Sequence, residues 1–501
     1  MGYALASTEQ SVIEDAVVPD TGCVFFLGCF EKRVTFYSQQ VRALNLVHAL
    51  LSEDVVRSKN GRVAVIGGGL AGVTVAAAFA RAAPEITVVI YESRDSLLGL
   101  QRGARDRFVH PHIFDWPVRA DEGDEAGLPL LNWRAGFATD IVAQLDKEFE
   151  SIVRHSRIDV RTGQKVTDIE VTAGIAAKVT TTGGVSSELY DAVIVCVGFG
   201  LEREVTPQAN PSYWSPSILP APFLSEQSAY SIFVSGNGDG GLADFALAAF
   251  GAKDHQQILS LVTGYPGLEQ LRAELLTIDN EAWKTEDFDI HAAYISRLTP
   301  LVPKHLLRDV FDLLRPSVKI ILHTRENNLL RRDTAVLSRF LVFLIIAADS
   351  KFNRNSIETV TGVNFSLATD GTGAVLLPGR PLFVPQIRML RFGPDAQTNM
   401  QPFDDLAQRY QRVHASRLSR RPTTPMLLPK VTERWPSPDV PPAVASDNGG
   451  VGAGGGGANA APVADVREAA HSNQINVVHG AVGTGATVTQ TYHVGNSKAG
   501  R

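Results

Sequence analysis

Residues 65–72 read VIGGGLAG, and this stretch decides the fold. It holds the pattern GxGxxG at Gly67, Gly69 and Gly72, directly after an apolar, β-branched run at 63–66. In a strand–loop–helix unit the first glycine allows a tight turn and the second lets a pyrophosphate approach the backbone. The third lets the helix pack closely on the strand. The stretch therefore predicts a dinucleotide-binding loop.

The residues after this loop complete the same unit. The small apolar residues at 73–83 predict a helix that the glycine loop opens. The backbone N–H groups at its start, on Leu70 and Ala71, would face the pyrophosphate. A second buried strand is expected at 86–91, and Glu92 ends it, where a carboxylate can accept hydrogen bonds from a ribose. Because an acid at this place disfavours a 2′-phosphate, the sequence favours FAD or NAD over NADP.

The composition excludes several classes of protein. The chain has 501 residues, of which 44% are hydrophobic and 20% charged, so it can bury a sizeable core. A net charge of −6 creates no field that attracts nucleic acid or an anionic membrane. Three cysteines are too few for a disulfide-stapled secreted scaffold. No basic segment followed by an apolar run opens the chain, so we expect no secretory signal. The longest strongly apolar run, at 340–348, is about half of what crosses a bilayer. We expect a soluble, cytoplasmic protein.

The expected fold class is α/β, with a doubly wound Rossmann-like parallel sheet, a second, mainly helical region, a disordered linker and a short β tail. An N-terminal extension with a packing helix is expected at 1–60, and the FAD- or NAD(P)-binding Rossmann-like domain at 61–250. The mainly helical region is expected at 251–430. Proline- and glycine-rich residues predict a flexible linker at 431–472. The β-branched residues at 473–501 predict a hairpin, or a strand that pairs with a partner.

Around this loop the chain resembles the two-dinucleotide-binding-domain flavoproteins, the FAD/NAD(P)-binding oxidoreductases. The features that carry the resemblance are the loop with Glu92, Gly99 in the segment that follows it, GQKVTDI at 163–169 and YDAVIVCVG at 190–198. In that family the strand similar to GQKVTDI touches the adenine through its backbone, here at Val166. The resemblance implies FAD as cofactor, with NAD(P)H as a further dinucleotide that the sequence leaves open.

A second glycine-rich stretch, SGNGDGGLAD at 235–244, also follows a strand-like run and precedes a helix-like one. It is interpretable as the loop of a second dinucleotide domain, which would hold NAD(P)H. Alternatively, Gly238 and Asp239 resemble the Gly-Asp pair with which these flavoproteins hold the ribityl and phosphate groups of the flavin. The first interpretation expects a strand that ends in an acid or Arg about 20–30 residues later. Residues 255–262 end without either, so we favour Gly238 and Asp239 as FAD contacts.

The segment RFVHPHIFDWP at 107–117 is dense in titratable and aromatic groups. In similar flavoproteins the chain after the second strand passes beside FAD toward the flavin ring. The resemblance therefore makes His110 and His112 candidate catalytic proton donors. The alternative is a rigid turn, with Trp116 in the core and both His residues bound to backbone. No further His or Cys cluster supports a metal site, and none is predicted.

Two functions remain open from the sequence. The first is a FAD-dependent oxidoreductase, related to NAD(P)H oxidoreductases or monooxygenases, that transfers a hydride between flavin and NAD(P)H or an organic substrate. No Cys-x-x-Cys or Cys-x4-Cys follows the first loop, which disfavours a dithiol relay. The second is a non-catalytic FAD- or NAD-binding sensor or assembly subunit of a multi-component bacterial system, for example in defence. The tail favours the second, since it suggests a protein partner or self-association.

Overall fold

The computed structural model describes residues 8–119, 123–172, 174, 176–185, 188–198, 202, 212–215, 230–250 and 255–435. The chain divides into two units, one made of Met1–Ala368 and Thr372–Ser437, the other of Thr369–Gly371 and Pro438–Arg501. The fold below is that of the first unit. The predicted β tail at 473–501 lies outside the described residues, as does the predicted linker after Trp435. Residues Pro429–Arg434 form a helix, α13, so the first residues of the range predicted as a linker are helical.

Five parallel strands form the first sheet of the described residues, in the order β1-β10-β2-β3-β6. Their bounds are β1 (Val24–Phe26), β2 (Arg62–Ile66), β3 (Thr87–Tyr91), β6 (Ile158–Arg161) and β10 (Ala192–Val195). The three central strands are buried along nearly their whole length because both faces of the sheet are covered, as is usual in parallel sheets. The predicted α/β, Rossmann-like fold is confirmed. The N-terminal extension also supplies a strand, β1, which the prediction did not include.

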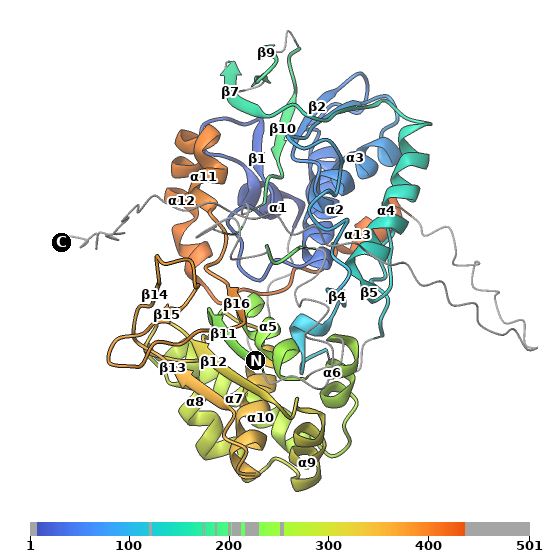
Figure 1. The fold of residues 1–501 in the computed structure, drawn as a ribbon. Coiled ribbons are helices and arrows are strands. Elements are labelled where there is room, and N and C mark those ends of the chain that lie inside the picture. Colours follow the sequence, from blue (N-terminus) through green and yellow to red (C-terminus); the bar gives the residue numbers. More distant parts are fainter. Residues whose placement is uncertain are drawn as a thin grey trace, which may run out of the picture. The chain divides into compact units, whose positions relative to one another are not determined.

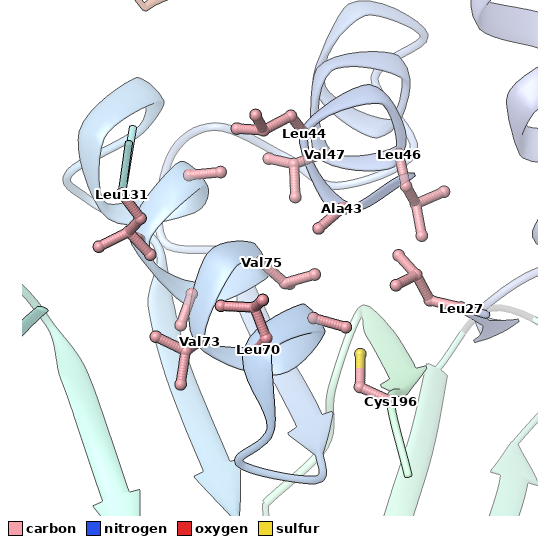
Figure 2. Close-up of a cluster of buried hydrophobic side chains, with 14 of the residues drawn as sticks. Leu27, Ala43, Leu44, Leu46, Val47, Leu70, Val73, Val75, Leu131 and Cys196 are labelled. Atoms are coloured by element: carbon pink, nitrogen blue, oxygen red, sulfur yellow. The ribbon is translucent and has the colours of Figure 1, made fainter. Parts of the chain in front are cut away.

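Helices from the extension cover the helix that follows the glycine loop. The helices of the extension are α1 (Glu9–Ala16) and α2 (Phe36–Ser52), and the helix after the loop is α3 (Leu70–Ala82). A further helix, α4 (Ala138–Val153), precedes β6. A capping box starts α2, because the Thr35 side chain accepts from the Ser38 N–H and the Ser38 side chain accepts from the Thr35 N–H. The helix then packs along α3 (Figure 1). Ala43 and Val47 of α2 face Val75 of α3 (Figure 2). The N-terminal extension therefore contains a helix that packs on α3.

Smaller elements surround the first sheet. One antiparallel sheet consists of β7 (Val166–Thr172), β8 (Ala176–Thr181) and β9 (Gly184–Val185). A separate antiparallel pair consists of β4 (Phe108–Val109) and β5 (Gly136–Phe137). The 3-10 turn η1 (Ile113–Asp115) follows β4. The C-terminal elements α11 (Ala396–Met400), η4 (Gln401–Phe403) and α12 (Asp404–Ser419) return to the first sheet. Phe403 and Tyr410 pack there in one buried cluster with Phe26 of β1.

A second parallel sheet of four strands is present, in the order β13-β12-β11-β16. Its strands are β11 (Tyr230–Ser235), β12 (Val318–His323), β13 (Ile357–Val360) and β16 (Ile387–Leu390). Its helices are α5 (Asp239–Ala249), α6 (His255–Thr263), α7 (Glu269–Lys284), α8 (Ile290–Ala293), the π-helix η3 (Tyr294–Leu298), α9 (Lys304–Leu313) and α10 (Val336–Lys351). A hairpin of β14 (Ser366–Leu367) and β15 (Val375–Leu376) packs beside it. In Figure 1, α5 and α10 lie side by side next to this sheet.

The second sheet changes the predicted organisation. Its central strand β11 and the helix α5 fall within residues 61–250, which were expected to form one domain with the first glycine loop. The range expected to be mainly helical, 251–430, contains β12, β13 and β16 together with its helices. The chain therefore carries two parallel sheets rather than one sheet and a helical region. None of the described helices combines the length and apolarity that a membrane span requires.

Candidate functional site

The first glycine loop has the geometry of a phosphate cradle. Gly67 has a φ of 108° and donates its N–H to the Tyr91 carbonyl over 2.8 Å, and a Cβ there would lie 2.7 Å from the Cys196 oxygen. A Cβ on Gly72 would lie 2.0 Å from the Gly67 oxygen, so neither residue can carry a side chain. Gly69 is the N-cap of α3, no side chain caps this helix, and no atom lies within 4 Å of a Cβ on Gly69. This open backbone, with the N–H groups at the start of α3, can receive a pyrophosphate.

Glu92 lies directly behind this loop. One carboxylate oxygen accepts from the Gly68 N–H over 2.6 Å, and the other accepts from the Arg94 N–H over 2.8 Å. The side chain is nearly buried at the end of β3. Each oxygen of a carboxylate can accept more than one hydrogen bond, so a ribose hydroxyl can still be bound. Glu92 therefore shapes the loop in the absence of any ligand, and its contact with a ribose stays a prediction.

Val166 is the first residue of β7, and the residues just before it are hydrogen-bonded to the chain at Glu92. The Gln164 N–H donates to the Glu92 carbonyl over 2.9 Å, and the Gly163 N–H donates to the Arg94 carbonyl over 2.7 Å. Val166 itself is buried in the core beneath the first sheet. The structure thus brings Gly67, Gly69, Leu70, Ala71, Gly72, Glu92 and the segment of Val166 to one end of the first sheet. The role of the Val166 backbone toward adenine stays a prediction.

The second glycine loop repeats the construction of the first. Gly236 has a φ of 126° and donates its N–H to the His323 carbonyl over 2.9 Å, as Gly67 does to Tyr91. A Cβ on Gly236 would lie 2.2 Å from the Arg391 oxygen, and one on Gly241 would lie 2.1 Å from the Gly236 oxygen. Gly238 is the uncapped N-cap of α5, and no atom lies within 4 Å of a Cβ there. Each loop therefore has the same two obligatory glycines and the same open one.

An acid also stands behind the second loop. The Asn237 side-chain amide donates to a Glu326 carboxylate oxygen over 3.3 Å, at the place where Gly68 donates to Glu92 in the first loop. Glu326 follows β12, the strand next to β11. The interpretation of this stretch as a second dinucleotide loop requires such an acid about 20–30 residues after the loop, and its absence there favoured a FAD contact in the sequence analysis. In the structure the acid comes from farther along the chain, because helices α5 to α9 separate Asn237 from Glu326 by 89 residues.

Asp239, predicted as a FAD contact with Gly238, has partners within the second sheet. It is the first residue of α5, and its carboxylate accepts from the Ala335 N–H over 2.8 Å at the start of α10. Burial raises the pKa of Asp239, while the hydrogen bond from Ala335 and the charge of Arg33 oppose that rise. The carboxylate therefore connects the starts of two helices. The contact of Gly238 and Asp239 with FAD remains a prediction.

His110 and His112 lie next to each other, with ring centroids 6.2 Å apart. His110 Nδ1 accepts from the N–H groups of His112 and Ile113, each over 3.1 Å, and so caps the turn η1. Burial, together with the charge of His112, lowers the pKa of His110. With Nδ1 as an acceptor, the proton of the neutral ring is on Nε2. His112 Nε2 lies 3.0 Å from the Glu125 carbonyl.

Trp116, in the same segment, is buried and stacks on Phe340 with the ring planes at 15°. These contacts agree with the alternative to a catalytic role, in which the segment forms a rigid turn with Trp116 in the core. A catalytic role of His110 and His112 as proton donors stays a prediction. Three or more His, Cys, Asp or Glu side chains do not gather at any point of the described chain in a way that could hold a metal ion.

Sequence analysis missed a buried ionic cluster beside the second loop. Asp244 of α5 is fully buried and accepts from Arg107 over 2.5 Å and from Arg391 over 2.6 Å. Arg391 also pairs with Glu202 over 3.0 Å, and the Arg107 guanidinium lies 3.5 Å from the centre of the Tyr213 ring. The available signal was an acid within the otherwise apolar run at 242–250. Because its partners lie more than a hundred residues away, their identity could not be predicted.

All three cysteines are buried and none forms a disulfide. Burial raises the pKa of Cys23 to about 11 and that of Cys29 to about 12, and it raises the pKa of Cys196 well above its ordinary value. A thiol must lose its proton to act as a nucleophile. Burial and the raised pKa values therefore favour a structural role for these three thiols.

Comparisons with known proteins identify the first glycine loop and its surroundings. Residues 65–124 match the family model of the NAD(P)-binding Rossmann-like domain. This match confirms the Rossmann-like domain predicted from the first loop. None of the curated proteins compared with the chain matches it in sequence.

Three reductases are among the solved structures that match this chain. Bacillithiol disulfide reductase Bdr from Bacillus cereus is 12% identical, with a TM-score of 0.34 over 69% of this chain and 81% of that chain. Thioredoxin reductase from Lactococcus lactis is 13% identical, with a TM-score of 0.32 over 67% of this chain and 78% of that chain. The NAD-dependent persulfide reductase from A. fulgidus is 13% identical, with a TM-score of 0.33 over 69% of this chain and 47% of that chain.

Proposed function

We propose that this chain is a FAD-dependent NAD(P)H oxidoreductase, with FAD at the first glycine loop and NAD(P)H at the second, in place of the FAD contact that the sequence favoured for Gly238 and Asp239. The observation that carries the proposal is the repetition of one loop geometry on two parallel sheets. In each loop the first glycine, Gly67 or Gly236, donates its N–H to the end of the neighbouring strand. In each loop the second glycine, Gly69 or Gly238, has open space where a Cβ would stand. Two such loops suit an enzyme that binds two dinucleotides and passes electrons between them.

The residues around the first loop fit FAD. The N–H groups at the start of α3 would bind its pyrophosphate, Glu92 its ribose and the Val166 backbone its adenine. Bound FAD would supply two-electron redox chemistry. His110 is a candidate to donate a hydrogen bond from Nε2, since burial lowers its pKa and favours the neutral ring with its proton on Nε2. Because the cysteines are buried thiols with raised pKa values, we propose an electron acceptor other than a disulfide reached through these thiols.

The test is the visible absorbance spectrum of the purified full chain, before and after anaerobic addition of NADH or NADPH. We expect flavin bands that bleach with at least one of the two nucleotides. A chain that stays colourless after incubation with FAD would contradict the assignment of the first loop. A yellow chain that neither nucleotide bleaches would contradict the oxidoreductase and leave a flavin-binding protein without this activity.

A further inference from the structure

The two loops differ in the first residue of the helix that follows. In α3 this residue is Leu70, whereas in α5 it is Asp239. The start of a helix attracts a diphosphate because its N–H groups are free and the helix dipole is positive there. A carboxylate at the same place opposes a diphosphate by charge repulsion. If the second loop binds a dinucleotide, something in the fold must offset the charge of Asp239.

Three arginines interact electrostatically with Asp239, namely Arg33, Arg331 and Arg339. Two of them are already committed to other carboxylates. Arg331 pairs with Asp333 and Glu326, and Arg339 pairs with Asp279. The charge of Arg331 is therefore matched by its two carboxylates. Arg339 shares Asp279 with Arg421, and its Nε and Nη1 are buried without a hydrogen-bond partner, so its charge is only partly matched.

Arg33 is the arginine of this group without a carboxylate of its own. Its guanidinium donates to the carbonyls of Arg332 and Thr334, over 3.3 and 3.4 Å, just before α10 begins. No carboxylate among the described residues lies within ion-pair distance of it, and its Nε is buried without a hydrogen-bond partner. The charge of Arg33 interacts with Asp279 and, more weakly, with Asp239, and no ion pair commits it to either carboxylate.

Arg33 comes from a different part of the fold than Asp239. It lies between β1 and α2, in the segment that joins elements of the first sheet, and its backbone has a φ of 54°. Its guanidinium also lies over the ring of Phe114, 5.5 Å from the centroid. The segment therefore projects a charged side chain from the first sheet toward the helix starts of the second.

We propose that Arg33 makes the second glycine loop competent to bind a diphosphate, by offsetting the negative charge of Asp239. The ligand class is a nicotinamide dinucleotide, so this inference rests on the proposed function. A site on the second sheet would then be complete only with a residue from the N-terminal extension. The extension would have a binding role in addition to its packing on α3.

The test is a double-mutant cycle on the full, FAD-loaded chain, with the dissociation constant of NADH and NADPH measured by calorimetry. Arg33→Gln removes the charge and is expected to weaken binding about tenfold or more. Arg33→Lys keeps the charge and is expected to bind nearly as well as the unmodified chain. Asp239→Asn keeps the acceptor for the Ala335 N–H, and the double variant is expected to recover most of the lost affinity. Lys32→Gln, which removes a neighbouring exposed charge, is the matched control and is expected to bind normally.

Two outcomes would overturn the inference while leaving the proposed function standing. One is unchanged affinity in Arg33→Gln. The other is a double variant as weak as Arg33→Gln, which would mean that Arg33 does not act through Asp239. If the unmodified chain binds neither NADH nor NADPH, the proposed function itself fails, and this inference fails with it. The FAD content and thermal unfolding midpoint of each variant show that the comparison is made between folded proteins.

Discussion

Arg107 donates to Asp244 over 2.5 Å, although the two residues are separated by 137 positions in the chain. Arg107 directly precedes β4, on the segment that continues to His110 and His112, whereas Asp244 belongs to α5 of the second sheet. Both side chains are almost completely buried. Arg391, which follows β16, donates to the other oxygen of the same carboxylate. One buried acid thus connects the segment of the candidate proton donors to the helix of the second glycine loop.

Replacement of Asp244 by Ala is expected to destabilise the protein strongly. It would leave the buried guanidinium of Arg107 without its carboxylate and Arg391 with Glu202 alone, and breaking a buried pair in this way costs about 3–5 kcal/mol. Urea unfolding monitored by circular dichroism measures the change. Asp312→Ala is the matched control, because Asp312 pairs with Arg308 at the surface, and we expect a loss of about 0–1 kcal/mol. A loss below about 1 kcal/mol for Asp244→Ala would show that the cluster does not hold the fold together.

The glycines of the first loop are expected to respond differently to alanine. Gly69→Ala adds a Cβ in open space, at a backbone φ of −74° that alanine adopts easily, so the fold should be retained. The same Cβ would occupy the place where the pyrophosphate approaches, and FAD content should fall sharply. Gly72→Ala puts a Cβ 2.0 Å from the Gly67 oxygen and should cost about 2 kcal/mol of stability or more. Thermal unfolding and bound flavin per chain separate the two effects.

The second loop offers the corresponding experiment with the other dinucleotide. Gly238→Ala also adds its Cβ in open space and should weaken NAD(P)H binding without loss of flavin. Gly123→Ala, equally open but remote in sequence from either loop, serves as the control. If Gly69→Ala and Gly238→Ala retain full affinity for both dinucleotides, the proposed binding mode at both loops is incorrect.

Glu92→Gln tests the acid behind the first loop. The substitution replaces one of two acceptor oxygens by an NH2 group, which then points at the N–H of Gly68 or of Arg94. We expect a stability loss of about 1–3 kcal/mol from the lost charge-assisted hydrogen bond. The affinity for FAD should fall about tenfold, because the ribose loses its charged acceptor. Urea unfolding and flavin titration measure the two losses. An unchanged flavin affinity in a destabilised variant would restrict Glu92 to shaping the loop.

The first loop was predictable because its parts are close together in the sequence. The strand, the glycines, the helix and Glu92 all lie within residues 62–92, and each has a local signal. The structure adds the contacts between residues that are far apart in the sequence, such as the pairing of β1 with β10. The glycines and Glu92 therefore lie on the strand–loop–helix unit that the sequence predicted, while the strand in the N-terminal extension was not predicted.

The second loop was only half predictable, for the same physical reason. Its glycines lie on a local strand–loop–helix pattern, but Glu326 and Arg391 reach it from the ends of neighbouring strands far along the chain. The order of strands in a sheet follows from packing rather than from sequence distance, and here several helices stand between two adjacent strands. Asp239 shows the consequence, because its partner Ala335 is 96 residues away. The role of such a residue follows from tertiary contacts that a motif does not contain.

The stability of the fold should fall as the pH decreases below about 6.5, and His323 should contribute to this loss. His323 is buried at the end of β12, with Nδ1 2.9 Å from the Ser235 hydroxyl and Nε2 2.9 Å from the Val363 carbonyl. Burial lowers the pKa of His323 below the ordinary value of 6.5. Below pH 6.5 the unfolded chain binds a proton at His323 more readily than the folded chain does, so acid favours unfolding. Above pH 6.5 this contribution to stability is fully present.

In His323→Gln the difference in unfolding free energy between about pH 7.5 and about pH 5.5 should shrink by roughly 1 kcal/mol. Urea unfolding at both pH values measures this, with exposed His155→Gln as the control, and an unchanged difference in His323→Gln would contradict the prediction.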